Sequence, residues 1–259
     1  MANKDKEYIG SLYLFHGYSM FLGTLPVPKL HSHHVTEIVI GKRSSVNIVT
    51  EKGTYKNDII LIGPDRPHTA KGDPKEVVII ILDPESELSL KLVSKYLGDN
   101  DAASIPVKRD MQAINRYFSD PSIENALKIY HSFIDSLEFT DSKKTQKDIR
   151  ITEAVNFIRN LDVKKASTNE IAEHVGLSEG RLIHLFKEQI GIPIRRYLIW
   201  HRIMHVMRVL LSGKSPTCAA HEAEFADYAH LSRNFTAMFG YSLSMFFKYI
   251  KFIKVKTSV

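Results

Sequence analysis

A pattern of two helices joined by a tight turn occurs twice between residues 167 and 240, and this repeat constrains the fold more than any other feature. The two copies align at three points: Ile171-Ala172 with Ala219-Ala220, Gly176-Leu177 with Glu224-Phe225, and Leu185-Phe186-Lys187 with Asn234-Phe235-Thr236. Ala219 follows Ile171 by 48 residues, whereas Gly240 follows Gly191 by 49, so the second turn holds one additional residue. A repeated helix-turn-helix pattern predicts a protein that binds DNA in two successive major grooves.

The first copy has the local signals of two short helices. Ser167 and Glu170 have the spacing of a capping box, which predicts a helix beginning there. Gly176 is suited to a left-handed turn, and Ser178 is an N-cap for the second helix. Three apolar residues of that helix face inward at helical spacing, namely Leu182, Leu185 and Phe186. The remaining residues form its outer face: Gly180, Arg181, Ile183, His184 and Lys187.

A longer helix is predicted between the two copies, over Arg195–Ser212, with Gly213 ending it. Eighteen helical residues span about 27 Å, which is close to the roughly 34 Å between successive major grooves on one face of B-DNA. A rigid connection of this length would present both units to the same face of a duplex.

These residues resemble the C-terminal DNA-binding domain of the AraC/XylS family of bacterial transcription regulators. The resemblance covers about residues 150–250, and its signature half is AAHEAEFADYAHLSRNFTAMFGYSLSMFFKY, residues 219–249. The resemblance implies base-facing positions at Gly180, Ile183 and His184 in the first unit. In the second unit it implies the following four: Tyr228, Ala229, Ser232 and Arg233.

Three positions depart from the family's pattern. Glu224 stands where the family has glycine, which predicts a strained or differently shaped turn, and Leu243 replaces a usual proline. Thr236 removes a phosphate contact that a basic residue would make. Because Gly180 and Ile183 carry no bidentate donor, we expect Arg233 of the second unit to supply more of the base specificity, with a phosphate contact as the alternative role.

The basic charge supports this division of the chain. The protein has 35 Lys and Arg against 29 Asp and Glu, a net charge of +6. Residues 1–149 contribute −1 and residues 150–259 contribute +7. The basic excess therefore lies where the helix-turn-helix pattern lies, as expected for a phosphate-binding surface.

The N-terminal part has the pattern of a small β-structure. Short runs rich in β-branched and aromatic residues alternate with Gly and Pro turns: Leu12–Phe15, Met20–Leu22, Glu37–Ile40, Val46–Val49, Ile59–Ile62 and Val77–Leu82. Many short strands without intervening helices predict a sandwich or barrel. From about residue 86 the period becomes helical, and an apolar stripe from Ile123 to Leu137 needs a partner surface, either the barrel or a second subunit.

Histidines and a carboxylate are spaced for a common site in this β-structure. His31, His33 and Glu37 have equal parity, so on a strand they would share a face, whereas His34 would face outward. His68 follows a later strand and a proline-containing turn. The spacing resembles the cupin fold, whose motifs supply three His and one Glu to a divalent metal. Three roles remain open here: a divalent transition-metal site, the wall of an organic ligand cavity, or a structural cluster.

Taken together, the sequence predicts a two-domain α+β protein. The predicted parts are a cupin-like sensory β-barrel (1–85), a helical dimerisation or support segment (86–140), a linker (141–149) and an all-α domain with two helix-turn-helix units (150–259). The sole cysteine, Cys218, excludes an internal disulfide. No run approaches the roughly 20 apolar residues that span a bilayer, and the N-terminus lacks an apolar signal core, so we expect a cytoplasmic protein.

The function expected from these features is a transcription regulator, an activator by resemblance, and not an enzyme. Promoter DNA, a small-molecule effector and RNA polymerase are the expected partners, with a homodimer as a further expectation and no membrane. Two alternatives remain. A metal-dependent cupin enzyme would use His31, His33, Glu37 and His68 as catalytic ligands, and a DNA-binding protein with a non-sensing barrel would be indifferent to metabolites.

Overall fold

The structure is a computed structural model that describes residues 10–72, 76–139, 147–160 and 167–255. Two compact units divide the chain differently from the predicted domains. The first unit combines Met1–Thr140 with Thr236–Val259, and the second is Asp141–Phe235. The predicted linker, 141–149, lies mostly outside the described residues, and its last residue, Ile149, begins a helix.

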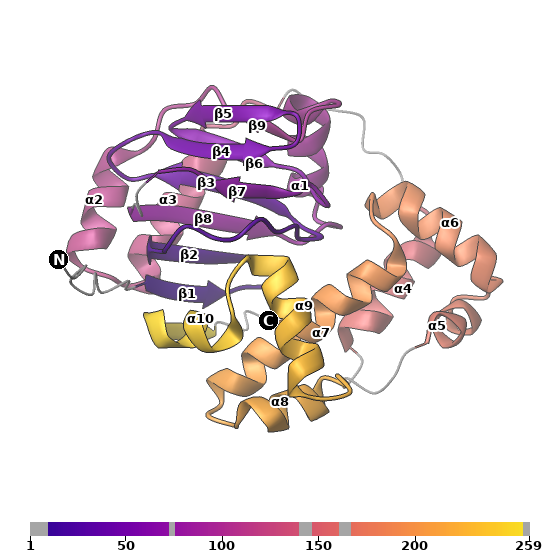
Figure 1. The fold of residues 1–259 in the computed structure, drawn as a ribbon. Helices are drawn as coiled ribbons and strands as arrows, with labels where there is room; N and C mark the ends of the chain where they lie inside the picture. The colour runs from indigo at the N-terminus through magenta and orange to yellow at the C-terminus, as the bar shows by residue number, and fades with distance from the viewer. Residues whose placement is uncertain (1–9, 73–75, 140–146, 161–166, 256–259) are drawn as a thin grey trace. The chain divides into compact units, whose positions relative to one another are not determined.

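The first unit is built on two sheets (Figure 1). The larger sheet has the order β10-β1-β2-β8-β3-β6-β9, and the smaller has the order β5-β4-β7. The strands are β1 Gly10–Leu14, β2 Tyr18–Thr24, β3 Thr36–Gly41, β4 Val46–Thr50, β5 Gly53–Asn57, β6 Ile59–Ile62, β7 His68–Ala70, β8 Glu76–Leu82, β9 Ala102–Ser104 and β10 Ile250–Val255. Each of the six predicted apolar runs lies on or overlaps a strand, so the sheet-rich prediction is confirmed. The described strands form two sheets and not a single closed ring, so closure of the predicted barrel is not observed.

Burial explains why these runs form strands. All six residues of β3 and all four of β6 are buried, because the central strands of the larger sheet are covered on both faces. In β4 the burial alternates along the strand, which is the pattern of a strand covered on one face only. The smaller sheet therefore covers one side of the larger sheet (Figure 1).

Helices cover the other face of the larger sheet (Figure 1). They are α1 Glu87–Leu92, the π-helical η1 Val93–Leu97, α2 Met111–Ser119 and α3 Ile123–Asp135. Ala126, Ile129 and Phe133 of α3 are buried in one apolar cluster with sheet residues such as Ile38 and Ile80. The predicted apolar stripe therefore has its partner surface within the chain, and it no longer argues for a second subunit.

The remaining helices include the four that form the repeated pattern, α5, α6, α8 and α9. They are α4 Ile149–Asn160, α5 Thr168–His174, α6 Glu179–Ile190, α7 Ile194–Leu211, α8 Pro216–Glu222, α9 Tyr228–Phe239 and α10 Leu243–Tyr249. The prediction of an all-α C-terminal domain is wrong in one respect: a strand, β10, follows α10 and pairs in parallel with β1. Within the described parts of the chain, no helix is both long and apolar enough to span a membrane.

Candidate DNA-reading surface and metal centre

The first helix-turn-helix unit consists of α5 and α6. Ser167 and Glu170 form the predicted capping box, in which each side chain bonds the other residue's backbone N–H. At the turn, Gly176 adopts φ +65, and the Leu177 N–H donates to the Ala172 carbonyl at 2.9 Å. Ser178 then caps α6. These contacts satisfy the backbone groups at both helix ends, which fixes the angle between the helices.

The second unit repeats this geometry in α8 and α9. The Phe225 N–H donates to the Ala220 carbonyl at 2.9 Å, which matches the bond between Leu177 and Ala172 in the first unit. Glu224 adopts φ 58, so a residue with a side chain has the left-handed conformation that Gly176 has in the first helix-turn-helix unit. The His230 N–H donates to Asp227 Oδ1 at 2.6 Å, near the start of α9. Because the turn from Glu224 to Asp227 is longer by one residue than that from Gly176 to Ser178, the predicted insertion is confirmed.

The outer faces of α6 and α9 are open. Leu182, Leu185 and Phe186 of α6 are buried, as predicted, in an apolar core that they form with residues of α4, α5 and α7. All five predicted positions on α6 are exposed, namely Gly180, Arg181, Ile183, His184 and Lys187. Of the positions predicted on α9, Tyr228, Ala229 and Arg233 are exposed and Ser232 is half-buried. The structure thus leaves the positions that the sequence predicts for DNA binding accessible, or half-buried in one case.

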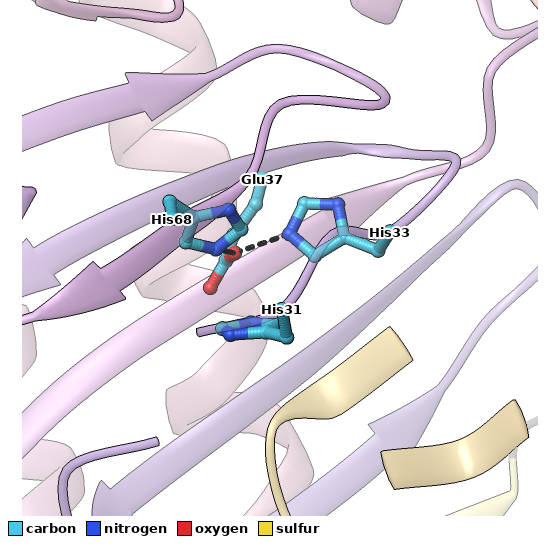
Figure 2. Close-up of side chains that lie close together, drawn as sticks. All are labelled: His31, His33, Glu37 and His68. Carbon is cyan, nitrogen blue, oxygen red and sulfur yellow. Dashed lines mark hydrogen bonds and ion pairs between the residues drawn. The ribbon is translucent and has the colours of Figure 1, made fainter. Parts of the chain in front are cut away.

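The four predicted residues of the N-terminal site come together between strands of the first unit (Figure 2). One side-chain donor atom from each of His31, His33, Glu37 and His68 lies within 4.8 Å of the others. His33, Glu37 and His68 are buried. Glu37 lies on β3, and His68 begins β7 and forms an isolated antiparallel bridge with His31.

The convergence was predicted, but its geometric reason was wrong. His31 and His33 precede β3 and do not share a regular strand with Glu37, so parity does not bring them together. The backbone bridge between His31 and His68 does so instead, with reciprocal N–H to carbonyl bonds of 3.1 and 2.8 Å. His34 is separate from the cluster, since its Nδ1 lies 2.5 Å from Asp65 Oδ1.

In all three histidines Nδ1 is hydrogen-bonded to a backbone carbonyl, which leaves Nε2 as the ring nitrogen available to the cluster. Nδ1 lies 2.9 Å from the Lys29 carbonyl in His31, 2.9 Å from the Val35 carbonyl in His33, and 2.8 Å from the Arg66 carbonyl in His68. Since a carbonyl only accepts, each Nδ1 carries a proton and donates it. The Nε2 atoms of His33 and His68 face Glu37 and donate to its carboxylate when they carry a proton. Loss of that proton would leave the lone pair on Nε2, which is the state required of a metal-ligating histidine.

Glu37 occupies the centre of the cluster (Figure 2). Its Oε2 lies 2.6 Å from His33 Nε2 and 3.2 Å from His68 Nε2. Burial raises the pKa of Glu37, but the hydrogen bonds from His33 and His68 outweigh it and hold the pKa well below the usual value. Burial lowers the pKa of His68, yet the bond to Glu37 leaves it raised overall. Burial, with His68 and His33 nearby, lowers the pKa of His31 to about 3.

This donor set fits a divalent transition metal. Three imidazoles and one carboxylate are borderline ligands that suit such ions, and backbone carbonyls orient all three rings. A cation would also compensate the buried negative charge of Glu37, which otherwise depends on proton sharing with His33 and His68.

Sequence reasoning missed two residues beside this centre. The Tyr241 hydroxyl donates to the Pro26 carbonyl at 2.6 Å, and burial followed by the charge of Glu37 raises its pKa. Gly240 adopts φ +72 and packs on the segment that carries His31, where an added Cβ would lie 2.6 Å from the Lys29 carbonyl oxygen. No sequence signal linked these positions to residues more than 200 places earlier.

One comparison with known proteins concerns the helix-turn-helix region. A family model described as a helix-turn-helix domain matches residues 171–249. These residues form an AraC-type helix-turn-helix domain. A helix-turn-helix domain of this type favours a DNA-binding transcription regulator over the enzyme alternative. No curated protein matches the chain in sequence.

Solved structures with the same fold include those of ToxT from Vibrio cholerae. The 1.65 Å structure shares 12% identity over 90% of this chain and 98% of that chain, with a TM-score of 0.56. ToxT from strain O395 shares 13% identity over 94% of this chain and 98% of that one, with a TM-score of 0.55. ToxT from strain SCE256, bound to an unsaturated fatty acid, shares 12% identity over 95% and 96%, with a TM-score of 0.54. At these identities the likeness shows a shared two-part fold.

Proposed function

We propose that this protein activates transcription by binding promoter DNA sequence-specifically, and that a divalent metal in the N-terminal unit controls that binding. The observation that carries the DNA part is the pair of helix-turn-helix units whose second helices, α6 and α9, keep their outer faces open. In such units the second helix enters the major groove and its N-terminal residues contact base edges. The residues proposed to contact DNA are Gly180, Arg181, Ile183, His184 and Lys187 on α6, and Tyr228, Ala229, Ser232 and Arg233 on α9.

The charge distribution supports a phosphate-binding role for the same part of the chain. Residues 150–259 carry a net charge of +7, against −1 for residues 1–149. Neutralising phosphates releases counterions, so we expect affinity to fall steeply with salt for all DNA, with a margin retained for specific sites. A homodimer is not required for this contact, because one chain holds both reading helices.

The centre formed by His31, His33, Glu37 and His68 is the proposed control site. A metal is favoured over an organic ligand at this point because three oriented Nε2 atoms and a carboxylate converge within 4.8 Å. ToxT has been seen with a fatty acid, and an organic acid is therefore the alternative effector for this chain. An anion placed at this cluster would meet the buried carboxylate of Glu37, which disfavours it.

Control requires that the metal bind two states of the protein with different affinities. Such coupling is typically worth about 1–3 kcal/mol, or roughly 5- to 150-fold in DNA affinity. RNA polymerase is the further partner that the AraC/XylS resemblance implies for an activator.

The test uses the purified full-length chain, reconstituted with Zn²⁺ or Co²⁺ and freed of excess metal. We expect about one metal per chain in the wild type and in the His34→Ala variant, which lies outside the cluster, and little in His33→Ala. Metal content that stays far below one per chain after reconstitution would refute the metal part alone. Binding to a promoter fragment is then measured by anisotropy at two salt concentrations, with and without the metal. Equal affinity for promoter and random DNA in every condition would refute the DNA part.

A further inference from the structure

Gly180 occupies a position in α6 that has no structural need for glycine. It lies within the helix, so it requires no left-handed conformation, and its position is exposed. A Cβ built there would meet no atom within 4 Å. Glycine inside a helix costs about 1 kcal/mol relative to alanine. Nothing in the described parts of the chain requires a glycine at this position, so the absence of a side chain is best explained by a molecule that approaches the helix closely.

Ile183 lies beside this bare position. Residues three and four apart share a helix face, so Gly180, Ile183 and His184 present one surface. Ile183 is 36% exposed and is one of five large apolar side chains exposed among the described residues. Because Leu182 and Leu185 on either side are buried, the orientation of Ile183 toward the outside is fixed by the core.

The second reading helix has different chemistry at the same places. Both helices begin one residue after their N-cap residues, Ser178 and Asp227, so Gly180 corresponds to Ala229, Ile183 to Ser232 and His184 to Arg233. At these three positions α6 offers no bidentate donor, whereas α9 offers a hydroxyl and a guanidinium; the guanidinium of α6 lies elsewhere, on Arg181. The alanine in α9 also shows that this type of unit accommodates a Cβ at the position of Gly180.

We propose that Gly180 and Ile183 read the methyl group of a thymine in the half-site bound by α6. The C5-methyl of thymine is the apolar group that base pairs display in the major groove. Ile183 supplies carbon atoms to contact it, and Gly180 leaves room for the base edge to approach the helix. The half-site under α9 is read through hydrogen bonds, so the complete operator is asymmetric in chemistry. This inference rests on the proposed DNA-binding function.

The test removes single methyl groups from the DNA. The full-length, metal-reconstituted chain first selects its site from a randomised duplex. Each thymine in the α6 half-site is then replaced by deoxyuridine, which lacks only the methyl, and the Kd is measured by anisotropy. We expect one replacement to weaken wild-type binding about four-fold, the worth of burying one methyl group. The same replacement should have no effect on Ile183→Ala, whereas Arg233→Ala should bind both duplexes more weakly but keep the four-fold ratio.

Gly180→Ala gives an independent readout, because it should leave the free energy of unfolding unchanged or raise it while weakening binding to the selected site. Undiminished affinity of Gly180→Ala, or a deoxyuridine effect that is equal in wild type and Ile183→Ala, would overturn this inference and leave the proposed function standing. Failure to select any site, at either of two salt concentrations and with or without metal, would overturn the proposed function and this inference with it.

Discussion

Glu224 is strained in the turn between α8 and α9, and replacing it by glycine should relieve that strain. Its φ of 58 places it in the left-handed region, where Gly176 lies in the first unit. A residue with a Cβ is disfavoured there by about 1–2 kcal/mol relative to glycine. The side chain offsets part of this through Arg202, whose Nη2 lies 3.7 Å from Glu224 Oε2. Since both side chains are partly exposed, that ion pair contributes only about 0.2–1 kcal/mol.

Two variants separate these contributions. Glu224→Gln keeps the Cβ and removes the charge, so it should lower the free energy of unfolding by about 0.2–1 kcal/mol. Glu224→Gly removes both, and the freedom that glycine gives the unfolded chain opposes the gain by about 0.4–1 kcal/mol. We therefore expect the Gly variant to be more stable than the Gln variant by about 1 kcal/mol, and equal to or slightly more stable than the wild type.

Urea unfolding followed by tryptophan fluorescence measures this difference. Trp200 is the protein's single tryptophan, and it is 4% exposed on α7. Trp200 and the turn at Glu224 both lie in the compact unit Asp141–Phe235, so the emission of Trp200 reports on the unfolding of that unit. A Gly variant that is no more stable than the Gln variant would refute the strain and indicate that Glu224 holds its left-handed conformation without cost.

Three further predictions follow from other sites. Gly240→Ala should lower the free energy of unfolding in urea by more than 2 kcal/mol, because the added Cβ would lie 2.6 Å from the Lys29 carbonyl oxygen. The control is Gly17→Ala, which also has a positive φ (+84) but open space around it, and which should lower the free energy of unfolding by only about 1 kcal/mol. Equal losses in the two variants would refute the close approach at Gly240. Burial, then the nearby Arg208, lowers the pKa of His201 to about 4, so the unfolded chain binds this proton below about pH 6.5 while the folded chain does not. Stability should therefore fall by up to about 3 kcal/mol between pH 6.5 and 4, and His201→Gln should reduce that fall; an unchanged profile would contradict the burial of His201. Arg233→Ala should relax specificity at one base pair at a cost of about 1–3 kcal/mol in competition binding, and uniform weakening on all sequences would assign Arg233 to a phosphate instead.

The helix-turn-helix units could be predicted from the sequence because their signals are local. Caps at Ser167 and Ser178 and the left-handed Gly176 lie within one turn of the residues they affect. The additional residue in the second turn was visible as a change in offset between the copies. A turn that is strained or differently shaped at Glu224 was likewise predicted from a departure at a single position, and Glu224 has a φ of 58.

Sequence reasoning failed where pairing is non-local. β5 is mostly exposed and β7 has three residues, so neither has an apolar run that predicts a strand. β10 pairs with β1 across more than 230 residues, and no periodic pattern encodes such a partner. The histidine cluster was predicted with the right residues by a parity argument that the structure does not support, because the bridge between His31 and His68 depends on backbone pairing across 37 residues.

Selection of genomic fragments by the purified full-length protein at two salt concentrations, followed by sequencing, tests the central claim most directly. Non-specific phosphate binding falls steeply with salt, whereas a specific complex keeps its margin over competing DNA. We predict enrichment of a few promoter fragments that persists at the higher salt, with sites that place two different half-sites in adjacent major grooves. Broad binding that salt abolishes, without any enriched site in the presence or absence of metal, would contradict a sequence-specific regulator.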